Sequence, residues 1–166
     1  MADSNDSGPN QLRNSVGFSL SQLGLETARQ FGDIVSTFGL EPRHFAVMHE
    51  VRRREGQAQQ AIADHLAIPA STMVAIVDHL EEKGLVERRP HLTDRRTRIL
   101  RLTARGDSLL SETLDAAQRQ EARICLGLEP HERDELLDML SRIAHNLDLP
   151  MSALPDRGSG QRPRGI

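Results

Sequence analysis

The sequence predicts a mainly α-helical fold with one small β-hairpin, and three observations support this. Apolar residues recur at steps of three and four along most of the 166 residues, which is the period of a helix. After Gly84 the period changes, because the β-prone runs "LVERRP" and "TRILRL" flank the turn-forming group "HLTD". A composition of 37% hydrophobic and 27% charged residues suits one globular domain with a single core.

Two helices are expected before the hairpin. The first covers about residues 15–38 and ends at "GLEP". Its apolar stripe consists of Val16, Leu20, Leu23, Thr27, Phe31, Ile34 and Phe38. The second begins near Pro42, since proline is favoured in a first turn, and ends at "RRREG". Its three arginines, residues 52–54, are either phosphate contacts or a solvated helix end.

Two short helices follow, about residues 58–66 and 71–83, joined by the tight "AIPA" connection. Ser71 is placed to cap the second of them. After the hairpin, Thr103 is expected to cap a long helix. The apolar stripe of that helix consists of Leu110, Leu114, Ala117, Ile124 and Leu128. Pro130 opens the last helix, which has Leu136, Leu140, Ile143 and Leu147 in register.

The two ends of the chain differ in composition from its centre. Residues 1–13 are expected to be a disordered head and residues 150–166 a flexible basic tail, which leaves one domain over residues 14–149. The start lacks the apolar core of a signal peptide, and no stretch approaches the ~20 apolar residues of a membrane span. The single cysteine, Cys125, cannot form an internal disulfide. A cytoplasmic protein without membrane contact is therefore expected.

Positive charge is concentrated around the hairpin, although the chain as a whole carries −3. The segment "HLTDRRTRILRLTARG" holds five arginines and one acid. Residues 84–106 together carry +5, so the remainder carries −8. Such asymmetry indicates either a local surface for a polyanion or a solvated charged face.

Two short helices at a tight turn, followed at once by a hairpin, describe a winged helix-turn-helix. The second short helix would lie in the major groove of DNA, with Met73, Ile76, Val77 and Leu80 packed inward. The hairpin would be the wing, whose arginines reach phosphates or a narrow minor groove. The candidate DNA contacts are Ser71, Thr72, Val74, Ala75 and His79 on the helix and Arg95, Arg96 and Arg98 on the wing.

The segment "QAIADHLAIPASTMVAIVDHLEEKGLVERRPHLTDRRTRILRLTARG", with the long helices on either side, resembles the MarR family of bacterial transcriptional regulators. The most specific parts are "LEEKGLVERR", Asp94 with Arg96 in the wing, and "LTARG". The resemblance implies a DNA-binding lobe over about residues 56–103. It also implies a homodimer built from helices over about residues 15–38 and 104–147, a pseudo-palindromic operator, and an anionic or phenolic effector.

One part of the second short helix departs from the family pattern. Many members carry a threonine and an arginine where this chain has Val74 and Ala75, and a further arginine where it has His79. Hydrogen bonding to bases is therefore expected to be sparse. Contact with thymine methyl groups and shape readout through the wing would supply more of the specificity.

A small aromatic or anionic effector is expected to bind close to the second helix. The candidate ligand-binding residues are Phe18, His44, Phe45, Met48 and His49, with ordinary packing as the alternative. His44 and His49 are five residues apart, about 140° around a helix, so they do not converge on a metal. Cys125 is expected to be a buried small hydrophobe rather than a peroxide sensor.

The sequence thus predicts a homodimeric regulator that binds double-stranded DNA, a repressor released from its operator by a small effector. The alternative is an effector-independent architectural DNA-binding or helical interaction protein. No enzyme and no cofactor are expected, because the chain has no glycine-rich phosphate loop, zinc-ligand cluster or nucleophile elbow.

Overall fold

The computed structural model describes residues 15–90 and 97–149. The fold is mainly α-helical with one antiparallel hairpin, as predicted. The elements are α2 (Val16–Thr37), α3 (Pro42–Arg53), α4 (Gln59–His65), α5 (Ala70–Glu82), β1 (Val86–Pro90), β2 (Arg98–Leu102), α6 (Ala104–Ile124) and α7 (Pro130–Asn146). The expected head and tail, and the wing residues Arg95 and Arg96, lie outside the described residues.

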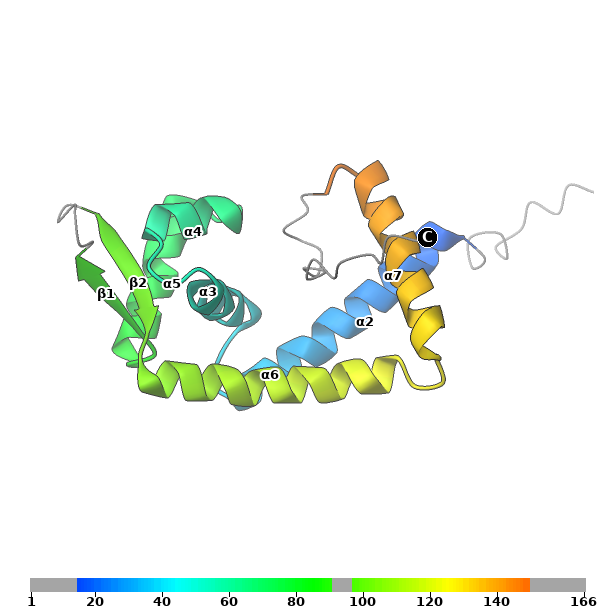
Figure 1. Ribbon diagram of the computed structural model, residues 1–166, viewed down its shortest axis with the longest axis horizontal. Coiled ribbons are helices and arrows are strands. Elements are labelled where there is room, and N and C mark those ends of the chain that lie inside the picture. Colours follow the sequence, from blue (N-terminus) through cyan, green and yellow to red (C-terminus); the bar gives the residue numbers. More distant parts are fainter. Residues whose placement is uncertain (1–14, 91–96, 150–166) are drawn as a thin grey trace, which may run out of the picture.

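The long helix α6 connects two parts of the molecule (Figure 1). At its N-terminal end lies a lobe of α3, α4, α5 and the two strands, and at its C-terminal end the chain turns into α7. Helix α2 packs along α6 and leads into α3. Among the described residues no single helix has the length and apolar character to span a membrane; α4 and α5 reach that length and composition only when counted together, across a bend of 117°.

The hairpin is fastened to the lobe on its β2 side. Strands β1 and β2 pair in the register Val86↔Leu102 to Pro90↔Arg98. Ala58 forms a further antiparallel bridge with Ile99, and the N–H of Leu100 donates to the carbonyl of Gln57 at 3.3 Å. The residues that lead into α4 therefore act as a short third strand at the base of the wing.

The lobe has one apolar core. Met73, Ile76, Val77 and Leu80 of α5 are all at most 3% exposed, which confirms the predicted inward face. They pack with apolar residues of α3, the hairpin and the first turns of α6, namely Val47, Met48, Val51, Leu85, Leu100 and Leu110. Burial of this face fixes the rotation of α5 and leaves its opposite face in solvent.

Three local predictions meet different outcomes. Thr103 caps α6, since its side chain accepts a hydrogen bond from the N–H of Gly106 at 3.0 Å. Ser71 does not cap α5: the helix begins earlier, with Pro69 at the N-cap and no side-chain cap bond. Proline holds an extended conformation there, and its carbonyl closes the first turn with the N–H of Met73. Helix α6 ends at Ile124, before Gly127 (φ 89°), so Leu128 lies outside it.

The start of α6 is pressed against the turn between α5 and β1. The hydroxyl of Thr103 donates to the carbonyl oxygen of Gly84 at 2.7 Å. The backbone N–H of Thr103 donates to the carbonyl oxygen of Leu85 at 3.1 Å. Gly106 is buried there, and a Cβ added to it would lie 1.9 Å from the carbonyl oxygen of Leu85. Only glycine fits this approach without movement of backbone.

Gly106→Ala should therefore lower the free energy of unfolding by roughly 2 kcal/mol, the scale of overpacking in a rigid core. Chemical denaturation followed by circular dichroism measures this. Gly24→Ala is the matched control, because a Cβ there meets nothing within 4 Å and alanine favours the helix. Equal stability of Gly106→Ala and wild type would contradict the packing argument.

Candidate nucleic-acid interface

The predicted contact residues of α5 lie on its outer face. Ser71, Thr72, Val74 and Ala75 are exposed, and His79 is half-buried at the edge. Val74 leaves 45% of its surface in solvent, which is high for a β-branched apolar side chain on a helix. Arg98 is exposed at the start of β2, so the structure gathers an exposed helix face and an exposed wing arginine in one lobe.

A pocket of about 250 Å³ lies between α5 and the first turn of α3. Thr72, Ala75 and His79 line it from α5, and Arg43 and His44 from α3. The rings of His44 and His79 stack with their centroids 4.7 Å apart. This stack joins the edge of the α5 outer face to the start of α3.

His44 also takes part in the capping box of α3. Its Nδ1 accepts a hydrogen bond from the N–H of Glu41 at 3.1 Å. Burial lowers the pKa of His44, and the neighbouring His79, Arg43 and Lys83 lower it further, against an opposing effect of Glu41. A neutral imidazole is therefore favoured, as an Nδ1 acceptor requires.

The five predicted ligand-binding residues do not come together in one place. Phe45 and His49 stack with ring centroids 5.9 Å apart. His44 lies beside His79, as above, and Met48 is fully buried in the core. Phe18 is 43% exposed near the start of α2. Of the five, only Phe45 and His49 form a pair that could face a ligand.

Phe31 of α2 completes this aromatic group, and the sequence reasoning assigned it only to an apolar stripe. Its ring meets that of Phe45 edge-on, with centroids 5.1 Å apart. Phe31 also lines a mainly apolar cavity of about 510 Å³ between α2 and α6, together with Ala28, Leu114, Ala117 and Ile124. The sequence does carry one signal for this group, because all four phenylalanines of the chain lie between residues 18 and 45.

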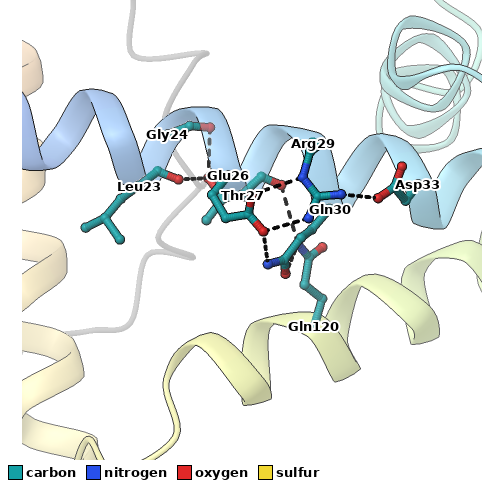
Figure 2. A network of polar contacts seen from close by, with 8 residues as sticks. All are labelled: Leu23, Gly24, Glu26, Thr27, Arg29, Gln30, Asp33 and Gln120. Carbon is teal, nitrogen blue, oxygen red and sulfur yellow. Dashed lines mark hydrogen bonds and ion pairs between the residues drawn. The ribbon is translucent and has the colours of Figure 1, made fainter.

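Polar contacts cross from α6 to α2 at the same cavity (Figure 2). The amide nitrogen of Gln120 donates to the carbonyl of Thr27 at 3.4 Å and to the side chain of Gln30 at 3.5 Å. Gln30 in turn donates to Glu26 at 2.7 Å, and Glu26 pairs with Arg29. The hydrogen bonds of Arg29 and Gln30 hold the pKa of Glu26 at about 2. The cavity thus has an apolar wall and a polar rim.

Comparison with known proteins assigns the chain to a family. A sequence model of the MarR family matches residues 38–97. A putative transcriptional regulatory protein for the hcr operon of Thauera aromatica is 31% identical over 133 residues, which is 80% of each chain. The chain belongs to the MarR family.

Solved structures of this family match nearly the whole domain. The transcriptional repressor CouR bound to a 23-mer DNA duplex is 34% identical and superimposes with a TM-score of 0.71, over 81% of this chain and 95% of that one. CouR from Rhodococcus jostii RHA1 bound to p-coumaroyl-CoA is 28% identical, with a TM-score of 0.69 over 80% and 94%. MarR from E. coli, 19% identical with a TM-score of 0.66 over 78% and 96%, shares the fold.

The arginines at the end of α3 are engaged within this MarR-family lobe. Glu50 has only 5% of its side chain exposed, and Arg53 pairs with it at 3.2 Å. Arg54 contacts the same carboxylate, and His65 of α4 approaches it at 3.4 Å. Arg52 donates to the hydroxyl of Ser111 on α6 at 3.1 Å. These contacts tie α3 to α4 and α6.

Cys125 is partly exposed, so the expectation of a buried cysteine is wrong. It stands at the C-cap of α6, where the chain leaves the helix, rather than beneath a packed face. Burial and the adjacent Glu121 raise the pKa of its thiol, which disfavours the reactive thiolate. In the described parts of the chain no three metal-ligating side chains gather into a group that could hold a metal ion.

The lowered pKa of His44 predicts how stability depends on pH. The unfolded chain takes up a proton near the ordinary histidine pKa, about 6.5, whereas folded His44 resists it. Stability should be full above about pH 6.5 and fall as the pH drops through the folded value. His44→Gln should weaken this dependence in denaturant titrations between about pH 8 and pH 5.

The exposed His131 of α7 provides the control for this measurement. His131→Gln should keep the wild-type dependence on pH. His49 retains part of the slope in both variants, because burial lowers its pKa as well. A His44→Gln profile that coincides with wild type would remove His44 from this account.

Proposed function

We propose that this protein is a homodimeric, DNA-binding transcriptional repressor that a small aromatic effector releases from a pseudo-palindromic operator. The observation that carries the proposal is the exposed outer face of α5, next to a basic wing, in a chain 34% identical to a repressor whose structure holds DNA. The burial of the opposite α5 face leaves this one free for the major groove.

Helix α5 and the wing would contact different parts of the DNA. Ser71 and Thr72 offer hydroxyl groups to base edges, and Val74 and Ala75 offer apolar contact with thymine methyl groups. His79 stands at the edge of the same face. The arginines at 95, 96 and 98 contact phosphates or the minor groove and supply most of the salt-dependent affinity.

A second copy of the chain is the proposed partner of the terminal helices. Large apolar side chains are exposed along α2, the end of α6 and α7, outside the lobe. They include Val16, Leu23, Leu25, Ile124, Leu126, Leu136, Met139 and Leu147, each between 40% and 86% exposed. An isologous dimer would cover this surface and place two α5 helices on one operator.

The free protein should therefore be a dimer at about micromolar concentration, as measured by light scattering. Leu136→Glu combined with Met139→Glu should shift it toward monomer, because two charges would enter the apolar interface. Arg142→Glu, an exposed polar position on the same helix, serves as the control. A wild-type monomer at this concentration would refute the dimer.

The effector is proposed to be an aromatic acyl compound, either a free acid or its CoA thioester. Phe31 lines the cavity of about 510 Å³, which lies in the usual range for small-molecule sites, and the rings of Phe45 and His49 extend the aromatic group from Phe31 toward α3. Burial and the nearby Arg52 and Arg53 lower the pKa of His49, against Glu50, so this ring offers a neutral hydrogen-bonding group. CouR from Rhodococcus jostii RHA1, whose structure holds p-coumaroyl-CoA and which is 28% identical to this chain, supports the thioester.

Release would follow from geometry. On one operator the two α5 helices must lie roughly 34 Å apart, one turn of DNA. A ligand wedged between α2, α6 and the Phe45 face of α3 would favour another spacing. Because coupling between sites is reciprocal, the operator must weaken effector binding by the same factor as the effector weakens operator binding.

Calorimetric titration with p-coumaroyl-CoA and p-coumarate, into free and operator-bound protein, tests this coupling. Affinity for one of them should fall about 100-fold in the complex, a difference of ~2.7 kcal/mol. Phe31→Ala should weaken binding to free protein, whereas Phe18→Ala should not. Equal affinity in both states, or no binding by either compound, would favour the effector-independent architectural alternative.

A further inference from the structure

Arg88 occupies an unusual place for an arginine of the basic hairpin. It lies opposite Leu100 in the register of β1 and β2, and Leu100 is fully buried. The side chain of Arg88 is only 22% exposed, whereas that of the next residue, Arg89, is 55% exposed. Side chains alternate across a strand, so Arg88 faces the helices of the lobe and Arg89 faces away.

The hydrogen-bond and ion-pair partners of Arg88 lie on two helices, α4 and α5. Its Nε donates to the side-chain oxygen of Gln59, the first residue of α4, at 2.9 Å. Its Nη1 lies 2.7 Å from the carboxylate of Asp78 on α5 and also contacts that of Glu81. The backbone N–H of Arg88 donates to Glu81 at 2.8 Å. One side chain therefore joins the wing to both helices of the helix-turn-helix.

The charge of Asp78 also matters for DNA binding, because Asp78 lies beside the proposed DNA-contacting face of α5. It is 53% exposed and follows Val74 by one helical turn. An uncompensated carboxylate there would repel DNA phosphates, and Arg88, whose single charge is shared with Glu81, offsets part of this repulsion at short range. The planar guanidinium can hold Asp78, Glu81 and Gln59 at once, which a lysine ammonium cannot do with the same geometry.

We propose that Arg88 is a positioning residue for sequence-specific DNA recognition: it fixes α5 relative to the wing and to α4, and offsets part of the charge of Asp78, without contacting DNA itself. The inference rests on the proposed function, since it presupposes that α5 reads an operator. It differs from the role proposed for Arg95, Arg96 and Arg98, because the donors of Arg88 are directed into the lobe and not toward a phosphate.

The test compares affinity for two DNA duplexes as a function of salt concentration. One duplex is enriched by the wild-type protein from a randomised library, and the other is an unrelated sequence of equal length. Arg88→Met should lower affinity for the enriched duplex by at least about 10-fold more than affinity for the unrelated one, which loses only the sequence-independent effect of the less compensated Asp78. The slope of log affinity against log salt should stay as in wild type, since no phosphate contact is lost.

Arg88→Lys serves as the second variant. It retains the positive charge, so it can be measured even if Arg88→Met does not fold. It should also lose preference for the enriched duplex, since the ammonium cannot reproduce the bonds of the fork. Arg89→Met removes one positive charge from the outer face of the same strand and should keep the preference. Thermal unfolding of each variant separates altered recognition from altered stability.

Three results would overturn the inference. A salt slope reduced by about 0.9, with equal losses on both duplexes, would make Arg88 a phosphate contact. If Arg88→Lys kept the full preference for the enriched duplex, a positive charge alone would be enough for recognition, and the geometry of the guanidinium would not matter. A lowered unfolding temperature with unchanged preference would make the role purely structural. A wild-type protein that enriches no sequence would instead overturn the proposed function, and the inference with it.

Discussion

The close approach of Gly106 to the backbone of Leu85 is the contact on which the arrangement of the molecule depends. It presses the first turn of α6 against the turn that leads from α5 into β1, with Thr103 bonded to both residues of that turn. Helix α6 carries the packing surface for α2 and ends at the connection to α7. This close approach therefore helps to set the orientation of the winged lobe relative to the terminal helices, together with the contacts of α3 to α2 and α6.

Helix α3 connects the two candidate sites, one on the lobe and one between α2 and α6. On one face His44 stacks against His79 at the edge of the proposed DNA-reading surface. On another face Phe45 and His49 join Phe31 beside the cavity between α2 and α6. Between them Met48 is fixed in the core, and Glu50 is held by arginines of the same helix. Because the interior is closely packed, a ligand that displaces α3 at one face must also displace the other.

Sequence periodicity predicted the helices, the hairpin and the inward face of α5, because these follow from local spacing. The prediction that Thr103 caps α6 is correct for the same reason. The prediction that Ser71 caps α5 is wrong, because α5 begins at Ala70 and Pro69 takes the N-cap position. Contacts between distant residues were not predictable in this way. Nothing in the spacing brings Phe31 to Phe45 or His44 to His79, since tertiary packing decides both. The prediction that Cys125 is buried is wrong because its neighbours Ile124 and Leu126 are themselves exposed at the end of α6.

Helices α3 and α7 begin in the same manner, with a glutamate at the N-cap, a proline after it and a capping box three residues on. These bonds join near neighbours in sequence, so no long loop must close before they form. Both helices are therefore suited to form early in folding, ahead of the long-range contacts of the lobe. In the proposed dimer, these local bonds would give α7 a defined first turn in each chain, and packing of its exposed apolar face against the second copy would supply most of its stability.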